Sequence, residues 1–196
     1  ADELPHRPNR FGNPAPGSAG YQGVTESAYD PREVRVPGFL PDTPPARAEL
    51  AQYYQSISRI DQGVGRLMQI LREAGKLDET LFLYISDHGI AMPNAKTTLY
   101  EGGMLSPCVM RNPYAAARGV TSNAMISWTD LAPTILDFAG ALDRETGTVK
   151  KEILERIPAN KSRSDPQTTQ AVRRGQFHGR SFLSLAGQES APGWDA

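Results

Sequence analysis

The strongest constraint on the fold is a long amphipathic helix that is followed, after a short turn, by a strand that is apolar on both faces. Apolar residues recur every three or four positions from Leu50 to Leu71, which is the spacing of one helical face. Residues 81–86, LFLYIS, follow the turn KLDET, and such a run is typical of a buried parallel strand covered by helices. A helix joined to a buried strand is half of a β-α-β unit, so we predict an α/β domain.

The ends of this first helix carry capping signals. Thr43 precedes two prolines, which fit the first positions of a helix, and a threonine before them is a good N-cap. Gly75 is expected to end the helix. Gly63 and Gly65 each weaken a helix by about 1 kcal/mol relative to alanine, which suggests that the helix packs closely against another element there.

Further elements and connections follow on either side. Residues 106–111, SPCVMR, are predicted to form a second buried strand, and residues 130–140 a helix that Asp130 caps and Gly140 ends. Residues 1–45 contain nine of the sixteen prolines, so we expect a loop segment that is disordered in isolation. We assign residues 46–140 to the α/β core, 141–177 to an insertion loop with a short helix at VKKEILERI, and 178–196 to the start of a C-terminal region.

Composition excludes several classes of partner. Twenty-one basic and twenty-two acidic residues give a net charge of −1, so we expect no nucleic acid and no anionic membrane surface as partner. The longest apolar run, LFLYI, is far shorter than the roughly 20 residues that span a bilayer. Residues 1–30 contain no targeting segment, which leaves the localisation unknown. Cys108 is the only cysteine, so there is no internal disulfide; the oligomeric state also stays unknown.

Chemistry-bearing residues appear where the first strand ends. Asp87, His88 and Gly89 follow residues 81–86 directly, and ligands of open α/β sheets bind beyond the carboxyl ends of the strands. A carboxylate oxygen and an imidazole nitrogen can bind one divalent cation, and Gly89 would let the backbone turn beneath it. From the dipeptide alone, an Asp–His hydrogen bond in a turn is an equally good interpretation.

Five motifs in order resemble the sulfatase family of the alkaline-phosphatase superfamily. They lie in residues 57–89, which run from ISRIDQGVG to YISDHG, in NAKTTLYEGGMLSPCVMRNP at 94–113, and in SWTDLAPTILDFAG at 127–140. HRPNRFG, AYDPREVRVPGFLPDTPPARAEL and HGRSFLSLAG look most like the heparan N-sulfatase, or sulfamidase, branch. The resemblance implies an alkaline-phosphatase-like three-layer sandwich with a mainly parallel sheet flanked by helices.

The resemblance also implies roles for individual residues. Asp87 and His88 fall on the family's metal ligands, with Ca²⁺ the usual ion and Mn²⁺ the alternative that a histidine ligand favours. Lys96 falls on the basic residue that contacts the sulfate, and His6 on a histidine that faces the leaving group. We expect Tyr100 and Glu101 to support the site rather than to act on substrate.

The expected function is hydrolysis of a sulfate ester or sulfamate on a sulfated small molecule or glycan. The family's nucleophile is a formylglycine made from a C/S-x-P-x-R motif, which this sequence lacks; Cys108 does not fit it and is expected to be a buried strand thiol. We therefore expect an internal or C-terminal piece of a longer enzyme, inactive alone. Two alternatives stay open: a phosphate or phosphonate monoester hydrolase, and a non-catalytic sugar-binding relative.

Overall fold

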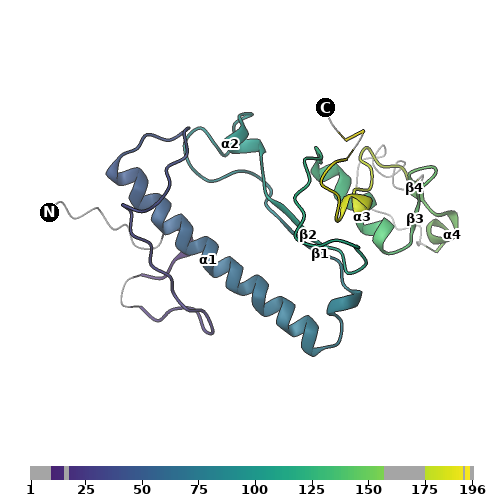
Figure 1. The fold of residues 1–196 in the computed structure, drawn as a ribbon, viewed down its shortest axis with the longest axis horizontal. Helices are drawn as coiled ribbons and strands as arrows, with labels where there is room; N and C mark the ends of the chain where they lie inside the picture. The colour runs from purple at the N-terminus through teal and green to yellow at the C-terminus, as the bar shows by residue number, and fades with distance from the viewer. Residues whose placement is uncertain (1–9, 16–17, 157–174, 192, 195–196) are drawn as a thin grey trace. The chain divides into compact units, whose positions relative to one another are not determined.

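The computed structural model describes residues 10–15, 18–156, 175–191 and 193–194. The chain divides into two compact units, Ala1–Asp78 with Tyr84–Val109, and Glu79–Leu83 with Met110–Ala196. Figure 1 shows the long helix α1 in the first unit and the shorter elements α3, β3, β4 and α4 in the second. The candidate site residues lie in the first unit.

Helix α1, Pro44–Glu73, has the ends that the sequence predicts. The Thr43 hydroxyl accepts a hydrogen bond from the backbone N–H of Ala46 at 3.4 Å, which satisfies one of the free donors at the helix start. Gly75 adopts φ +66° directly after the helix, the left-handed conformation that closes many helices and suits glycine best. Both capping predictions are confirmed.

The expectation of close packing at Gly63 and Gly65 is wrong for the residues that the structure describes. A Cβ atom added to either glycine would meet nothing within 4 Å. Apolar side chains along the same half of α1 are also exposed, namely Leu67 and Ile70, each at 47%. This part of α1 therefore carries an apolar surface that the described residues leave open.

The described residues before Thr43 form no α-helix or strand, and side-chain contacts fix them to α1. Beyond a 3-10 helix at Arg10–Gly12, this loop is held by side chains: Arg59 donates to the Asn13 side chain at 2.7 Å. Gln62 exchanges two hydrogen bonds with the backbone of Thr25, both at 2.8 Å. The loop therefore gains its order from α1 rather than from its own secondary structure.

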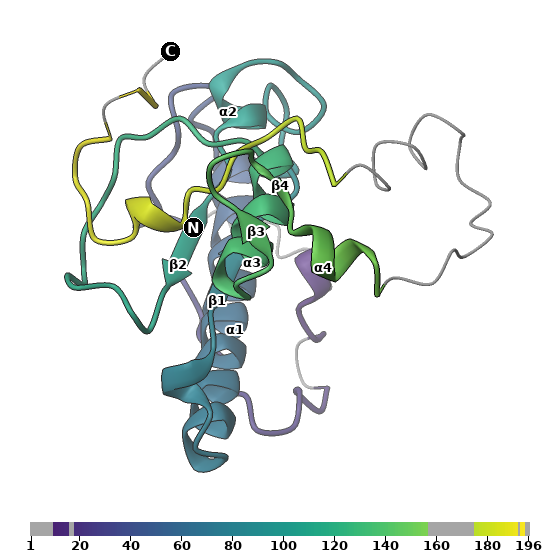
Figure 2. The same ribbon diagram turned by 90° about the vertical axis from the view of Figure 1, so that its right-hand side faces the viewer.

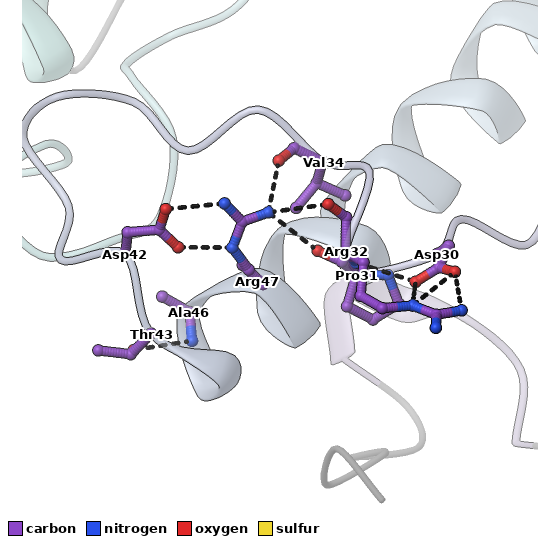
Figure 3. A network of polar contacts seen from close by, with 8 residues as sticks. All are labelled: Asp30, Pro31, Arg32, Val34, Asp42, Thr43, Ala46 and Arg47. Atoms are coloured by element: carbon purple, nitrogen blue, oxygen red, sulfur yellow. Dashed lines mark hydrogen bonds and ion pairs between the residues drawn. The ribbon is translucent and has the colours of Figure 1, made fainter. Parts of the chain in front are cut away.

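Arg47 fastens the last part of this loop to the start of α1 (Figure 3). Its guanidinium makes two hydrogen bonds to the Asp42 carboxylate, at 2.5 and 2.7 Å. A third nitrogen donates to the backbone carbonyl groups of Pro31, Arg32 and Val34 at 3.4, 3.1 and 3.2 Å. The planar fork of arginine suits such simultaneous contacts, and Val34 belongs to the small apolar core beneath, with Leu40, Leu50 and Ala51.

Strands β1, Phe82–Ile85, and β2, Cys108–Arg111, form a two-stranded sheet at the two predicted positions. The expected burial on both faces is wrong for this chain, because Ile85 and Val109 are 37% and 61% exposed. The described sheet has no further strand beside this pair, and two strands do not bury both of their faces.

The second unit contains a short helix, a small hairpin and the C-terminal segment (Figure 2). Helix α3, Leu131–Phe138, packs on β3, Leu142–Asp143, which pairs antiparallel with β4, Thr148–Val149. Helix α4, Lys151–Leu154, lies where a short helix is predicted in the insertion. The 3-10 helix Leu183–Leu185 follows Ser181, whose hydroxyl donates to the Asp137 carboxylate at 2.6 Å.

Asp130 does not cap α3 in the predicted way. A 3-10 helix, Trp128–Asp130, precedes α3, and Ser127 forms a capping box with Asp130. The Asp130 carboxylate accepts the backbone N–H of Ser127 through one oxygen and that of Arg180 through the other, each at 2.8 Å. Asp130 is thus buried as a junction between α3 and the C-terminal segment.

No helix within the described ranges is long and apolar enough to cross a membrane.

Candidate functional site

The turn after β1 holds Asp87 and His88 as neighbours. Asp87 Oδ1 and His88 Nε2 are 3.4 Å apart, and the side chains are 85% and 36% exposed. The Ser86 hydroxyl donates to the His88 carbonyl at 2.8 Å, which stabilises the backbone of the turn. Both side chains are therefore accessible while the backbone that carries them is fixed.

A hydrogen bond sets the orientation of the His88 ring. Nδ1 lies 2.8 Å from the Gly89 carbonyl oxygen, and a carbonyl can only accept, so Nδ1 carries the proton. In a neutral imidazole Nε2 then has a free lone pair on the side of Asp87 Oδ1. This is the arrangement in which histidine ligands bind metals, with the other nitrogen held by a backbone carbonyl.

Asp87 and His88 offer two donors that are close enough to share one cation. A carboxylate oxygen and an imidazole nitrogen suit a divalent cation, and their separation lets both contact the same ion. Within the described residues no group of three or more His, Cys, Asp or Glu side chains could hold a metal ion. The residues present fit a divalent cation as a partial ligand set.

Lys96 lies on a tight turn within the same loop. Its backbone N–H donates to the carbonyl of Ile90 at 3.0 Å, which places the Lys96 backbone against a residue two positions after His88. Its side chain is exposed. The neighbouring residue Thr97 has φ +70°, a conformation that is costly for a β-branched residue and that persists only where the surroundings impose it.

Tyr100 and Glu101 begin the short helix α2, Glu101–Met104. The Tyr100 carbonyl accepts the N–H groups of Gly103 and Met104, at 2.9 and 3.0 Å. The Tyr100 side chain is 71% exposed, so Tyr100 supports this loop through its backbone. The supporting role of Tyr100 and Glu101 at the site stays a prediction.

Gly102 and Gly103 are two residues of this loop to which the sequence motifs assign no role. Gly103 is buried and accepts the backbone N–H of Gly89 at 2.9 Å. A side chain on Gly89 would overlap the Gly102 carbonyl, so the two chain segments are in backbone contact. The signal available in the sequence was the glycine pair itself, directly after Tyr100 and Glu101.

His6 and Cys108 are the two remaining residues for which the sequence predicts a role. His6 lies outside the described residues. Cys108 is half-buried in β2, and burial raises the pKa of its thiol above the ordinary value. A raised pKa keeps the thiol protonated and unreactive at neutral pH, in agreement with the expected structural role.

Both the sequence and the fold are similar to those of known proteins. The sulfatase family model matches residues 4–141. Human N-sulphoglucosamine sulphohydrolase is 45% identical over 130 residues, which cover 66% of this chain and 26% of the human protein. The chain thus spans about a quarter of the length of this relative.

Two solved structures share the fold. One is a protein in complex with its substrate D-glucosamine-2-N,6-O-disulfate, and it is 26% identical with a TM-score of 0.51. The superposed part makes up 81% of this chain and 28% of the other chain. The phosphonate monoester hydrolase of Silicibacter pomeroyi is 26% identical with a TM-score of 0.55 and covers 85% of this chain and 28% of its own. These similarities confirm the predicted α/β, alkaline-phosphatase-like fold.

Proposed function

The chain belongs to the sulfatase family, and we propose that the whole protein hydrolyses a sulfate ester or sulfamate on a sugar. The observation that carries this proposal is the pairing of Asp87 Oδ1 with His88 Nε2, 3.4 Å apart at the end of β1. The Lys96 turn lies in the same loop, one hydrogen bond from Ile90. Two candidate metal ligands and the Lys96 ammonium group on one loop suit a substrate whose reacting group is an anion.

Asp87 and His88 would hold a divalent cation, Ca²⁺ in the first instance and Mn²⁺ as the alternative. Calcium prefers oxygen ligands and takes six or more, whereas an imidazole ligand is better suited to a transition metal. When bound, the cation supplies fixed positive charge at the sulfuryl oxygens. The remaining ligands would come from outside the described residues.

The side chains of this chain have separate tasks in the reaction. The Lys96 ammonium would contact the sulfuryl oxygens and stabilise the negative charge that develops on them as the bond from sulfur to nitrogen or oxygen breaks. His6 would donate a hydrogen bond or a proton to the leaving atom. The nucleophile we propose is a formylglycine in another part of the whole protein.

For the substrate we propose an N-sulfated glucosamine unit, as a free sugar or within a glycan. Support comes from the 45% identity to human N-sulphoglucosamine sulphohydrolase. It also comes from the solved neighbour that binds a glucosamine with an N-sulfate and an O-sulfate. A second candidate is hydrolysis of phosphonate or phosphate monoesters, which the similarity to a phosphonate monoester hydrolase favours; a non-catalytic sugar-binding protein is the third.

The test is a comparison of kcat/KM for the full-length protein on glucosamine N-sulfate, glucosamine 6-sulfate and phenyl phosphonate monoesters. We expect the highest value on the N-sulfate and a loss of turnover after chelation of divalent cations. A preference for the phosphonate would support the second candidate instead. Binding of the sulfated sugars without turnover of any substrate would support the third.

A further inference from the structure

The turn that carries Asp87 and His88 is in direct backbone contact with the glycine pair of α2. The Gly89 N–H donates to the Gly103 carbonyl at 2.9 Å. On the same side, the Gly102 carbonyl oxygen occupies the place where a Cβ atom of residue 89 would lie. No larger residue than glycine fits at position 89 without moving this backbone.

The turn that carries Lys96 contacts the same glycine pair. A Cβ atom on Gly103 would overlap the carbonyl oxygens of Ala95 and Thr98, the residues that flank Lys96 and Thr97. A Cβ atom on Gly102 would come within 3.3 Å of the Asn94 carbonyl oxygen and 3.4 Å of the Ala95 side chain. The glycine pair thus touches both turns, which are also joined directly by the hydrogen bond from the Lys96 N–H to the Ile90 carbonyl.

The conformation of the Lys96 turn indicates that its surroundings hold it in place. Thr97 has φ +70°, a value that a β-branched residue rarely adopts unless contacts impose it. Ala95 is fully buried, and the Thr98 hydroxyl donates to its carbonyl at 2.7 Å. A free turn would relax to an ordinary conformation, so this one is held by what packs against it.

We propose that Gly102 and Gly103 are positioning residues that hold the Lys96 turn at a set place relative to Asp87 and His88. The inference rests on the proposed function, because it assigns the two turns to one reaction. Charged groups that stabilise a transition state must be in place before the reaction, and a displacement of about 1 Å can cost roughly 10²-fold in rate. Because Gly102 and Gly103 have no side chains, their backbone atoms contact both turns directly. We call this contact the brace; it limits how far one turn can move relative to the other.

The test uses graded alanine substitutions in the full-length enzyme. Gly103→Ala introduces an overlap with two carbonyl oxygens, whereas Gly102→Ala makes tight contacts, 3.2 Å at the closest, that neighbours can relieve by small shifts. The added methyl group of Gly63→Ala in α1 meets none of the described residues within 4 Å, and this variant is the matched control. We expect kcat to fall roughly 10²-fold in Gly103→Ala, about threefold or more in Gly102→Ala, and not at all in Gly63→Ala.

Two readouts separate positioning from a merely structural role. Affinity for Mn²⁺, measured by titration well below the melting temperature, should weaken roughly tenfold in Gly103→Ala, as when a supporting residue of a metal ligand is lost. In the Lys96→Ala background, Gly103→Ala should lower kcat by no more than about twofold further, because the group that it displaces is already absent. A structural role alone would lower the melting temperature, leave the Mn²⁺ affinity unchanged, and lower kcat by the same factor in the Lys96→Ala background as in the wild type.

Wild-type kcat and wild-type Mn²⁺ affinity in folded Gly102→Ala and Gly103→Ala would overturn the inference. If Gly103→Ala does not fold, Gly102→Ala decides alone, and a wild-type kcat there also overturns it. A Lys96→Ala enzyme with normal kcat would instead contradict the proposed role of Lys96. The Mn²⁺ affinity of the glycine variants then decides whether the brace acts on the metal pair.

Discussion

At the scale of single residues, the candidate site depends on groups that are exposed yet held by backbone contacts. Asp87 and His88 are accessible at the end of β1, and the Gly89 carbonyl fixes which His88 nitrogen is free. Lys96 is exposed on a turn whose backbone bonds to Ile90. The proposed chemistry thus rests on exposed side chains, whereas the main chain beneath them sets their positions.

Replacement of Lys96 tests the charge that we assign to it. If the ammonium stabilises the sulfuryl oxygens mainly in the transition state, Lys96→Ala in the full-length enzyme should lower kcat by roughly 10²-fold or more. Bound metal, measured in the same samples, should stay at the wild-type level. Lys151 in α4 is 89% exposed at its side chain, so Lys151→Ala is the control; equal kcat in both variants would leave Lys96 a surface lysine.

At the scale of elements, the predicted helices and strands are confirmed and several of their contacts are not. The ends of α1 and both strands of the β1–β2 sheet follow from local signals, since caps and apolar periodicity act over a few residues. The residues next to Asp130 in the sequence predict that it caps α3, because local patterns contain no information on distant partners. Its partner Arg180 is 50 residues away, and no local pattern indicates such a pairing.

The absence of long-range contacts from local sequence patterns also explains why the packing around the glycines was not predictable. Gly63 and Gly65 predict packing that the described residues do not provide. Gly89 is predicted to allow a sharp turn, and Gly102 and Gly103 are predicted only as part of a family pattern, but the three form a backbone junction. A glycine signals that a side chain is absent, but its sequence position does not say which distant atoms fill the space. Residue types at the site were therefore predictable, and the junction that holds them was not.

The junction at Asp130 should be important for the stability of the second unit. Asp130→Asn offers an N–H group to one of the two backbone donors that the carboxylate now accepts, Ser127 or Arg180. A buried donor left unsatisfied costs about 1–3 kcal/mol, so we expect the free energy of unfolding to fall by that amount in denaturant titrations. Glu145 is exposed, and Glu145→Gln should leave the unfolding midpoint unchanged; equal midpoints for both variants would contradict the junction.

The Arg47 network predicts a pH dependence at the start of α1. Hydrogen bonds from Arg47 lower the pKa of the Asp42 carboxyl below its ordinary value of 3.8. A pKa that is lower in the folded state adds stability above the unfolded pKa, and this stability is lost as the pH falls through the folded pKa. Arg47→Gln should therefore raise the Asp42 midpoint toward 3.8 in a carboxyl NMR titration.

Asp30 supplies the control for that titration. Its pKa is lowered to about 2, first of all by the side-chain hydrogen bonds from Arg32. Arg47→Gln should leave the Asp30 midpoint in place, and Arg32→Gln should raise it without moving Asp42. An Asp42 midpoint that does not respond to Arg47→Gln would show that the contacts in Figure 3 do not persist in solution.

At the scale of the whole molecule, the proposed function assigns to this chain one side of a catalytic centre. The chain spans 26% of its human relative, and apolar side chains on α1, β1 and β2 are exposed. Asp87 and His88 are the two metal donors that we propose, and the described residues contain no larger group of His, Cys, Asp or Glu that could hold a metal ion. Two donors alone bind a hard cation weakly, because calcium takes six or more ligands. The metal pair should therefore be tested in the full-length protein.

The most direct measurement is the metal content of that protein after dialysis, determined by elemental analysis for the wild type, Asp87→Ala and His88→Ala. His178 is exposed in the second unit, and His178→Ala is the control for the loss of a histidine. We predict bound divalent cation in the wild type and the His178 variant, and a loss of it in both Asp87→Ala and His88→Ala. Wild-type metal content in the Asp87 and His88 variants would contradict the assignment of this pair as metal ligands.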